Sequence, residues 1–298
     1  MTTYDFIAEN KRRTVVLLTV FSVFVLSIGF VIDQYKHTGG AFLGFAIIYT
    51  VISALVSYYA GDTIALRMSD AQQITAAENK NLYRTIENLC ISQGLPMPKV
   101  YVINDPAINA FATGRDPQHA SIAVTTGALT KLENEELEGV LAHELSHVQN
   151  YDIRVMTIVI VLVGIVSIMA NLIFRMSFGE RNSKNDRGTG PLLVIAIVLM
   201  ICAPIIANLI QLAISRRREY LADASGALMT RFPEGLARAL RKIERDALPM
   251  ANPSAATAHL FIANPFTNMT LAKFFSTHPP IADRIAKLEQ MASLKEMR

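Results

Sequence analysis

Four long stretches without a charged residue limit what this chain of 298 residues can fold into. Each is 18 to 23 residues long, and an apolar helix of about 20 residues crosses the hydrocarbon core of a bilayer. Of all residues, 51% are hydrophobic and only 18% are charged, which is too apolar for a typical soluble enzyme. The sequence therefore predicts a mainly α-helical membrane protein with four transmembrane helices, at residues 15–32, 41–59, 155–174 and 192–214.

The first span follows three basic residues, Lys11, Arg12 and Arg13, so a cleaved signal peptide is an alternative to a retained anchor. The polar stretch after the span, residues 33–37, offers no small-residue cleavage site. We therefore expect this span to stay in the protein as the first helix of a multi-pass set.

The positions of Lys and Arg near the span ends predict the orientation. These residues are more numerous on the side of the N-terminus, which the positive-inside rule places in the cytoplasm. The loop over residues 175–191 holds four basic residues and argues the other way. We expect a protein of the plasma or inner membrane whose polar segments face the cytoplasm.

The polar segment at residues 61–154 has the composition of a folded domain. A run rich in helix-forming residues predicts a helix over residues 70–93, and acidic residues near its start indicate a second helix that begins at Lys131. Short runs rich in β-branched and small apolar residues predict a small sheet between the two helices, with strands at residues 99–103, 110–113 and 121–126.

The helix predicted after this sheet carries the pattern His-Glu-x-x-His. His143 and His147 are four residues apart and lie on one helix face, so their imidazoles can share one Zn²⁺, while Glu144 is placed to activate water. An accidental match is expected in roughly 1 in 200 chains of this length. A motif that lies on a helix after a small sheet has the context of a zincin-like α+β metallopeptidase domain.

A catalytic zinc needs a third protein ligand from elsewhere in the chain. Glu219 and Asp223 are preferred because they are one helical turn apart just after the fourth span. The pair could supply one ligand and one carboxylate that holds a histidine in its metal-binding tautomer. For Glu219 the alternative is an exposed charge beside three arginines. Other acidic candidates for the third ligand are Asp152, Glu234 and Glu244.

Four motifs in order resemble the HtpX-type membrane metallopeptidases, which are related to the eukaryotic CAAX prenyl protease. They are Asn-Ala-Phe-Ala-Thr-Gly-Arg (109–115), His-Glu-Leu-Ser-His-x-x-Asn-x-Asp (143–152), Arg-Arg-Glu-Tyr-x-Ala-Asp (217–223) and Thr-His-Pro-Pro-x-x-x-Arg-Ile (277–285). The resemblance implies that His143, His147 and Glu219 bind one zinc per chain. It also implies that Glu144 is the general base and that Asp223 lies behind a histidine ligand.

The resemblance further implies how a substrate is held. His278 and Arg284 look like the family's pair that polarises the scissile carbonyl or steadies the oxyanion. For His278 the alternative is a turn residue before Pro279-Pro280, and for Arg284 a charge on a helix face. The edge strand on which such enzymes lay the substrate backbone corresponds to Asn109, Ala110, Phe111, Ala112, Thr113 and Gly114.

The function expected is that of a zinc endopeptidase in the membrane, acting on polypeptides such as misfolded or damaged membrane proteins in a stress response. The alternatives are a CAAX-type processing peptidase and a non-catalytic scaffold with a degenerate peptidase domain. A scaffold should have lost a ligand or the base, but all the candidate residues are present. A transporter should carry ionisable residues in its spans, but the four uncharged runs contain no Asp, Glu, Lys, Arg or His. Natural substrates and oligomeric state stay open.

Charge and cysteine content exclude other classes. The formal net charge of +3 gives no case for a nucleic-acid partner, and two cysteines, neither near the histidines, provide neither a disulfide framework nor a zinc finger. The organisation predicted is an N-terminal arm and hairpin of spans (1–60), a first peptidase segment (61–154), a second hairpin (155–214) and a second peptidase segment (215–298).

Overall fold

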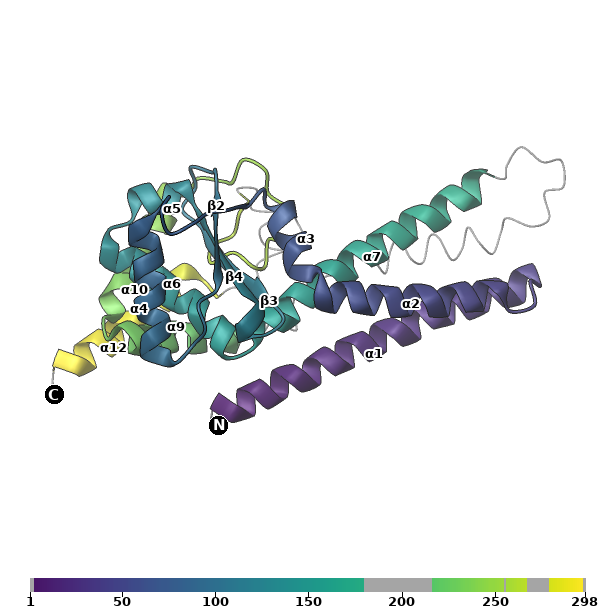
Figure 1. The fold of residues 1–298 in the computed structure, drawn as a ribbon, viewed down its shortest axis with the longest axis horizontal. Helices are drawn as coiled ribbons and strands as arrows, with labels where there is room; N and C mark the ends of the chain where they lie inside the picture. The colour runs from purple at the N-terminus through teal and green to yellow at the C-terminus, as the bar shows by residue number, and fades with distance from the viewer. Residues whose placement is uncertain (1–2, 180–215, 255, 267–278, 297–298) are drawn as a thin grey trace.

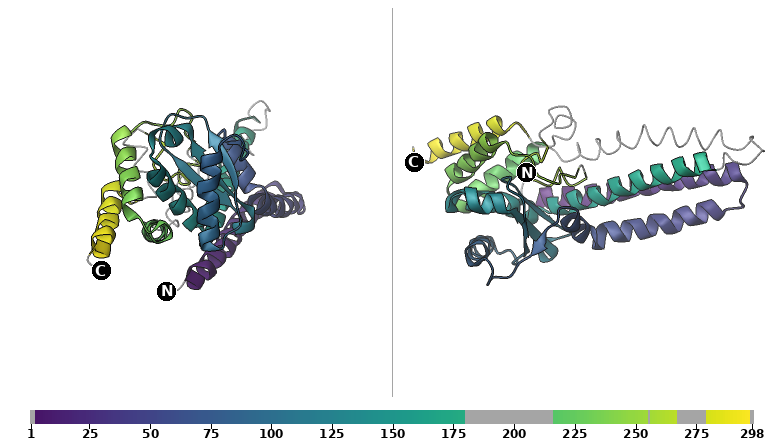
Figure 2. Two further views of the ribbon diagram at one scale, coloured as in Figure 1. Left: turned by 60° about the vertical axis from the view of Figure 1, so that its left-hand side comes forward. Right: turned by 90° about the horizontal axis from the view of Figure 1, so that it is seen from above.

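The computed structural model describes residues 3–179, 216–254, 256–266 and 279–296, and Figure 1 shows their arrangement. Within these residues the chain is mainly helical with a small mixed sheet. The three long helices α1 (Thr3–Lys36), α2 (Ala41–Tyr59) and α7 (Asp152–Gly179) extend in one direction from a lobe that contains the sheet (Figures 1 and 2). The predicted span at residues 192–214 and the candidate His278 lie outside the described residues.

The described residues form helices and short strands. They are α1 (Thr3–Lys36), α2 (Ala41–Tyr59), α3 (Gly61–Met68), β1 (Gln72–Gln73), α4 (Lys80–Gln93), β2 (Lys99–Ile103), β3 (Ala110–Gly114), η1 (Pro117–His119), β4 (Ala120–Thr125), α5 (Thr126–Lys131), α6 (Asn134–Gln149), α7 (Asp152–Gly179), α9 (Arg216–Thr230), α10 (Pro233–Asp246) and α12 (Ile281–Glu296).

Two described helices, α1 and α2, are long and apolar enough to cross a membrane. They contain the spans predicted at residues 15–32 and 41–59. A third candidate arises if α6 and α7, whose axes are bent by 81° at Asn150 and Tyr151, are counted together. Tyr151 has a left-handed backbone (φ 60°), which turns the chain out of the lobe into α7. The helix α7 contains the third predicted span.

The long helices pack through small side chains and direct large apolar ones outward. The buried positions of α2 are Ala46, Thr50, Ser53 and Ser57. A Cβ added to Gly29 of α1 would lie 2.3 Å from that of Ala46, so α1 and α2 approach closely. Small residues inside and large apolar residues outside are typical of helices in lipid. The exposed apolar side chains on these two helices include Val15, Val16, Val20, Val23, Phe30, Phe45, Ile48, Ile52 and Leu55.

The sheet has the strand order β1-β2-β4-β3, with β2 and β4 parallel and the outer pairs antiparallel. Both faces are covered. Ile122 and Val124 of β4 join the core formed with α4, α6 and α10, whereas Ala123 joins a second core with α3 and α7. Because both faces are buried, the strands lack a clear polar–apolar alternation. The strand β3 is at the edge of the sheet, beside the helix α6.

The helix boundaries differ from the sequence expectation in two places. The helix predicted over residues 70–93 begins only at Lys80, where the Asn79 side chain accepts a hydrogen bond from the Leu82 N–H. Of the preceding residues, Gln72 and Gln73 form the short strand β1, and the others lie in turns and irregular segments. The helix predicted from Lys131 begins at Asn134, because Glu133 and Glu136 form a reciprocal capping box that fixes its first turn.

The crossing of α9 over α6 depends on Gly226. A Cβ at this position would lie 2.9 Å from the backbone nitrogen of His143. We expect Gly226→Ala to push the helices apart and destabilise the fold by about 1–3 kcal/mol, measured by thermal unfolding in detergent with circular dichroism. Gly164→Ala is the control because a Cβ there meets no atom of the described residues within 4 Å. Equal unfolding temperatures for the two variants would contradict this account of the crossing.

Candidate metal centre

Two helices bring three side chains with metal-binding atoms together. His143 and His147 project from α6, and Glu219 projects from α9, which packs against α6. One ligand atom from each lies within 4.8 Å of the others. The Nε2 atoms of His143 and His147 are 3.3 Å apart. Glu219 Oε2 is 3.7 Å from His143 Nε2, and Glu219 Oε1 is 3.6 Å from His147 Nε2. All three residues are buried.

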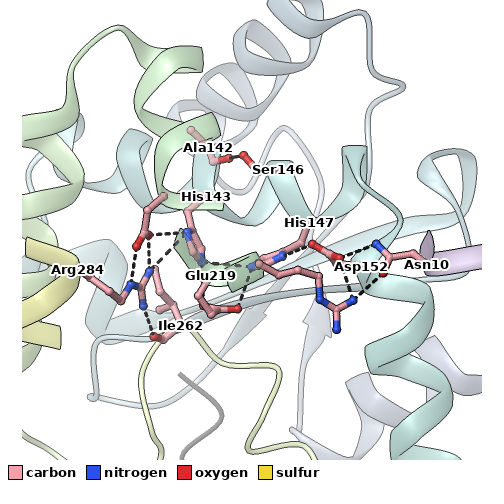
Figure 3. Close-up of polar contacts among 11 residues, drawn as sticks. Asn10, Ala142, His143, Ser146, His147, Asp152, Glu219, Ile262 and Arg284 are labelled. Atoms are coloured by element: carbon pink, nitrogen blue, oxygen red, sulfur yellow. Dashed lines mark hydrogen bonds and ion pairs between the residues drawn. The ribbon is translucent and has the colours of Figure 1, made fainter. Parts of the chain in front are cut away.

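Each histidine is held from behind by its own carboxylate, as Figure 3 shows for His147 and Asp152. The Nδ1 of His143 is 3.0 Å from Asp223 Oδ1, and the Nδ1 of His147 is 3.0 Å from Asp152 Oδ2. A proton on each Nδ1 donates to the carboxylate and leaves the Nε2 lone pair directed at Glu219. This tautomer is the one that binds a metal through Nε2.

The two imidazoles have different electrostatic surroundings. Burial, with the Arg284 guanidinium nearby, lowers the pKa of His143 to about 4, although Asp223 opposes the shift. Burial also lowers the pKa of His147, but Asp152, Glu219 and the charge of Glu144 outweigh it and raise the pKa to about 9. The site is therefore rich in negative charge around His147. Such a site favours a cation shared by the two Nε2 atoms and the Glu219 carboxylate.

Glu144 follows His143 on α6 and is 1% exposed. Burial raises the pKa of its carboxyl to about 8, and the Glu219 carboxylate adds to the effect. The Ala112 N–H of β3 is close enough to this carboxylate to oppose the rise in its pKa, so Glu144 lies beside the edge of the sheet. A carboxyl group whose pKa is near neutrality can both accept and return a proton, which is what a general base needs.

Arg284 of α12 is fully buried and pairs with Asp223 through two hydrogen bonds. Its Nε and Nη2 atoms donate to the two Asp223 oxygens at 2.9 and 2.7 Å, and its Nη1 donates to the Ile262 carbonyl at 3.2 Å. Arg284 thus holds the carboxylate that holds His143 (Figure 3). The alternative of a charge on a helix face is wrong, because the side chain is 0% exposed. Contact with a scissile carbonyl stays a prediction.

The predicted substrate strand coincides with β3 and the preceding Asn109. The backbone N–H and C=O groups of Ala110, Ala112 and Gly114 point away from β4, toward the side of β3 that has no neighbouring strand. There the Ala110 carbonyl accepts from the Ile262 N–H at 3.0 Å, and the Gly114 N–H donates to Thr157 Oγ1 at 3.1 Å. The side of β3 that faces away from β4 therefore lies next to Glu144 and is contacted by Ile262 at one end and by Thr157 at the other.

The sequence indicates Asp152 only as a possible third ligand and gives no role to Asn10 or Arg218. The structure places Asp152 behind His147, where its second oxygen contacts both of those residues. Asp152 lies within the His-Glu-Leu-Ser-His-x-x-Asn-x-Asp motif, which is a signal that could have found it. No pattern in the sequence links Asn10 to a residue 142 positions away.

A donor set of two imidazole nitrogens and one carboxylate, buried and accompanied by a glutamic acid on the same helix, defines a metallopeptidase-like centre. Comparison with known proteins gives the family. The model of Peptidase family M48 matches residues 76–292. The chain belongs to this family, and it is a membrane metallopeptidase that acts on polypeptides.

Several relatives bear the name "Protease HtpX homolog". The protein from Tropheryma whipplei (strain Twist) is 45% identical over 97% of this chain and 99% of its own length. Proteins from Lactobacillus helveticus and Caldanaerobacter subterraneus subsp. tengcongensis are 43% and 42% identical, over 97% of this chain and 99% and 98% of their own lengths. The fold is similar to the crystal structure of S. mikatae Ste24p, with a TM-score of 0.50 at 18% identity, over 96% of this chain and 67% of that one.

Proposed function

We propose that this protein is a zinc endopeptidase that spans the membrane four times and cleaves misfolded or damaged membrane proteins. The observation that carries the proposal is the buried set of His143, His147 and Glu219, with a carboxylate behind each histidine. Two histidines and one glutamate are the protein ligands of a well-known class of catalytic zinc sites, which keep a further position open.

Zinc fits the donors better than Mg²⁺ or Ca²⁺ does. Imidazole nitrogen suits Zn²⁺, whereas Mg²⁺ and Ca²⁺ prefer sites made wholly of oxygen. When bound, Zn²⁺ supplies a Lewis acid that polarises the peptide carbonyl and lowers the pKa of water. Asp223 and Asp152 keep the two imidazoles in position, so the ligand set is formed before substrate arrives.

Glu144 carries the proton in the proposed reaction. Its carboxylate takes a proton from a water molecule as that water attacks the peptide carbonyl, and it then gives the proton to the leaving amine. As the resemblance implies, the substrate backbone would lie along β3 as an added strand beside Glu144, where it would replace the contacts of β3 with Ile262 and Thr157. Arg284 and His278 would steady the developing oxyanion, as the resemblance implies, and Arg284 also fixes Asp223.

The membrane arrangement is supported by aromatic and basic residues at one end of the long helices. Tyr59 ends α2 and has the Arg115 guanidinium 5.2 Å from its ring, and Tyr151 at the start of α7 lies 5.1 Å from Lys11 Nζ and 5.0 Å from the Arg154 guanidinium. Tyrosine side chains concentrate at both membrane–water interfaces, and basic side chains are in excess on the cytoplasmic side. We propose that the peptidase segments 61–154 and 215–298 face the cytoplasm, close to the bilayer.

A comparison of substrates tests this function. Protein purified in detergent, stripped with a chelator and reloaded with Zn²⁺ is offered an unfolded membrane protein, casein and a peptide with a prenylated C-terminal CAAX sequence. We expect cleavage of the unfolded membrane protein at the highest kcat/KM, and no cleavage before reloading. Cleavage of the CAAX peptide alone would favour the processing function instead. No cleavage of any polypeptide by zinc-loaded protein would contradict the proposal.

A further inference from the structure

The N-terminal part of α1 reaches the metal centre through one amide side chain. Asn10 Nδ2 donates to Asp152 Oδ1 at 2.7 Å and to the Asn150 carbonyl at 2.8 Å. Asn10 Oδ1 accepts a hydrogen bond from Arg218 Nη1 at 2.7 Å. The same Arg218 nitrogen is 3.1 Å from Asp152 Oδ1. One oxygen of Asp152 thus receives both donors, while its other oxygen faces His147.

This group joins three helices at one point. Asn10 belongs to α1, Asp152 begins α7, and Arg218 is one residue before Glu219 on α9. Figure 3 shows the contacts as one line from His147 to Asp152 and on to Asn10. Asn10, Asp152 and Arg218 are 2%, 1% and 6% exposed. Water therefore cannot easily replace a partner that is lost, and polar contacts made in such surroundings fix side-chain orientation strongly.

A carboxylate can turn about its Cβ–Cγ bond unless both oxygens are engaged. Asp152 has its Oδ1 held by Asn10 and Arg218, so its Oδ2 is held toward His147 Nδ1 at 3.0 Å. The direction of that oxygen sets the plane of the imidazole and the direction of Nε2. The Asn10 amide also donates to the Asn150 carbonyl at the bend between α6 and α7, and so it fixes the chain next to the ligand helix.

We propose that Asn10 is a positioning residue of the metal centre, so that the first membrane helix is a structural part of the site. Asn10 acts through Asp152 on His147 and contacts neither ligand atoms nor substrate. The inference rests on the proposed binding of zinc by His143, His147 and Glu219. It implies that α1 does more than anchor the enzyme. If the first turns of α1 moved away from α7, Asp152 would lose a hydrogen-bond donor and His147 would no longer be held in one orientation.

The alternative is that Asn10 only ties α1 to the lobe. Thr14 provides a matched control because it lies one turn further along the same helix and is also buried, at 5%. Among the residues that the structure describes, its Oγ1 donates only to the Asn10 carbonyl, at 3.0 Å and within the helix. Thr14→Val should therefore affect the packing of α1 without affecting Asp152, whereas Asn10→Leu removes the amide and keeps the branching of the side chain.

The test measures metal binding of the full-length protein in detergent, without substrate. Zn²⁺ affinity is measured by competition with a chromophoric chelator, and the geometry of the site by the visible spectrum of the Co²⁺-substituted protein. We expect Asn10→Leu to weaken Zn²⁺ binding about ten- to hundredfold and to change the Co²⁺ spectrum, while Thr14→Val matches the wild type. If Asn10→Leu does not fold, the same measurements on Asn10→Ala, which removes the amide without adding bulk, test whether Asn10 positions the metal centre.

The outcomes separate this inference from the proposed function. Wild-type protein that binds zinc, together with folded Asn10 variants of unchanged affinity and unchanged Co²⁺ spectrum, would overturn the inference alone. Wild-type protein that binds no zinc would overturn the proposed metal and this inference with it. Lower unfolding temperatures for both Asn10 and Thr14 variants, with zinc affinity unchanged in both, would show that Asn10 is only a tether and would also overturn it.

Discussion

Replacing Glu144 by Gln is expected to lower kcat about 10³-fold and to leave one zinc per chain bound. Glutamine has nearly the same shape but cannot take a proton from water. Glu144 is outside the group of three ligands formed by His143, His147 and Glu219. The loss should therefore appear in catalysis and not in metal content. The measurement is the cleavage rate of an unfolded membrane protein, with the zinc content of the same sample determined by elemental mass spectrometry.

Glu138→Gln is the control for this experiment. Glu138 lies on the same helix, partly exposed, and is neither in the ligand set nor in contact with β3 in the described contacts. This variant should cleave at the wild-type rate. Cleavage by Glu144→Gln at a rate close to that of the wild type would remove Glu144 from the role of general base.

Replacing Glu219 by Ala is expected to reduce both zinc content and cleavage. Its carboxylate lies between the two imidazoles, and its removal leaves only the two histidines of α6. Loss of an outer partner of a metal ligand costs roughly ten- to hundredfold in affinity, so loss of a ligand should cost more than about 100-fold. Zinc affinity by chelator competition and zinc retained after gel filtration both measure the effect.

Glu244→Ala is the matched control, because the sequence alone left Glu244 open as a third ligand. The structure places it exposed on α10, outside the ligand group. We expect this variant to keep wild-type zinc affinity. If Glu219→Ala kept full zinc occupancy, the third ligand would have to be a different residue.

The sequence predicts those parts of the site that depend on spacing along one helix. His143 and His147 share a face because they are four residues apart, and Glu219 and Asp223 share another for the same reason. The uncharged runs identify α1 and α2 in the same way, because the bilayer requires a minimum length of apolar helix. Each of these inferences uses contacts between residues that are close in sequence.

The remaining features depend on contacts between distant segments. The close crossing at Gly226 brings Glu219 to the histidines, and nothing around that glycine in the sequence indicates its partner. Arg284 was expected at the substrate, but its two hydrogen bonds to Asp223 depend on how α12 packs against α9. Asn10 lies in a polar stretch that gave no sign of a role, yet it is buried against Asp152.

Boundaries set by local capping were also missed. The capping box of Glu133 and Glu136 starts α6 three residues after the predicted Lys131, and its sequence signal is weak because the N-cap is Glu where Ser or Thr is usual. Residues 70–79 predict helix because they contain many helix-forming side chains, but two of them form the strand β1. Its two residues are strand only because they pair with Tyr101 and Val102 of β2.

The central claim is that one metal, held by His143, His147 and Glu219, is required for peptide-bond cleavage by this protein. The most direct measurement is a titration of the chelator-stripped wild type in detergent with Zn²⁺, in which bound zinc and cleavage rate are followed in the same sample. We expect the rate to rise in proportion to bound zinc and to stop rising at one equivalent per chain. Full cleavage by the metal-free protein, or a rate that does not depend on bound zinc, would contradict the claim.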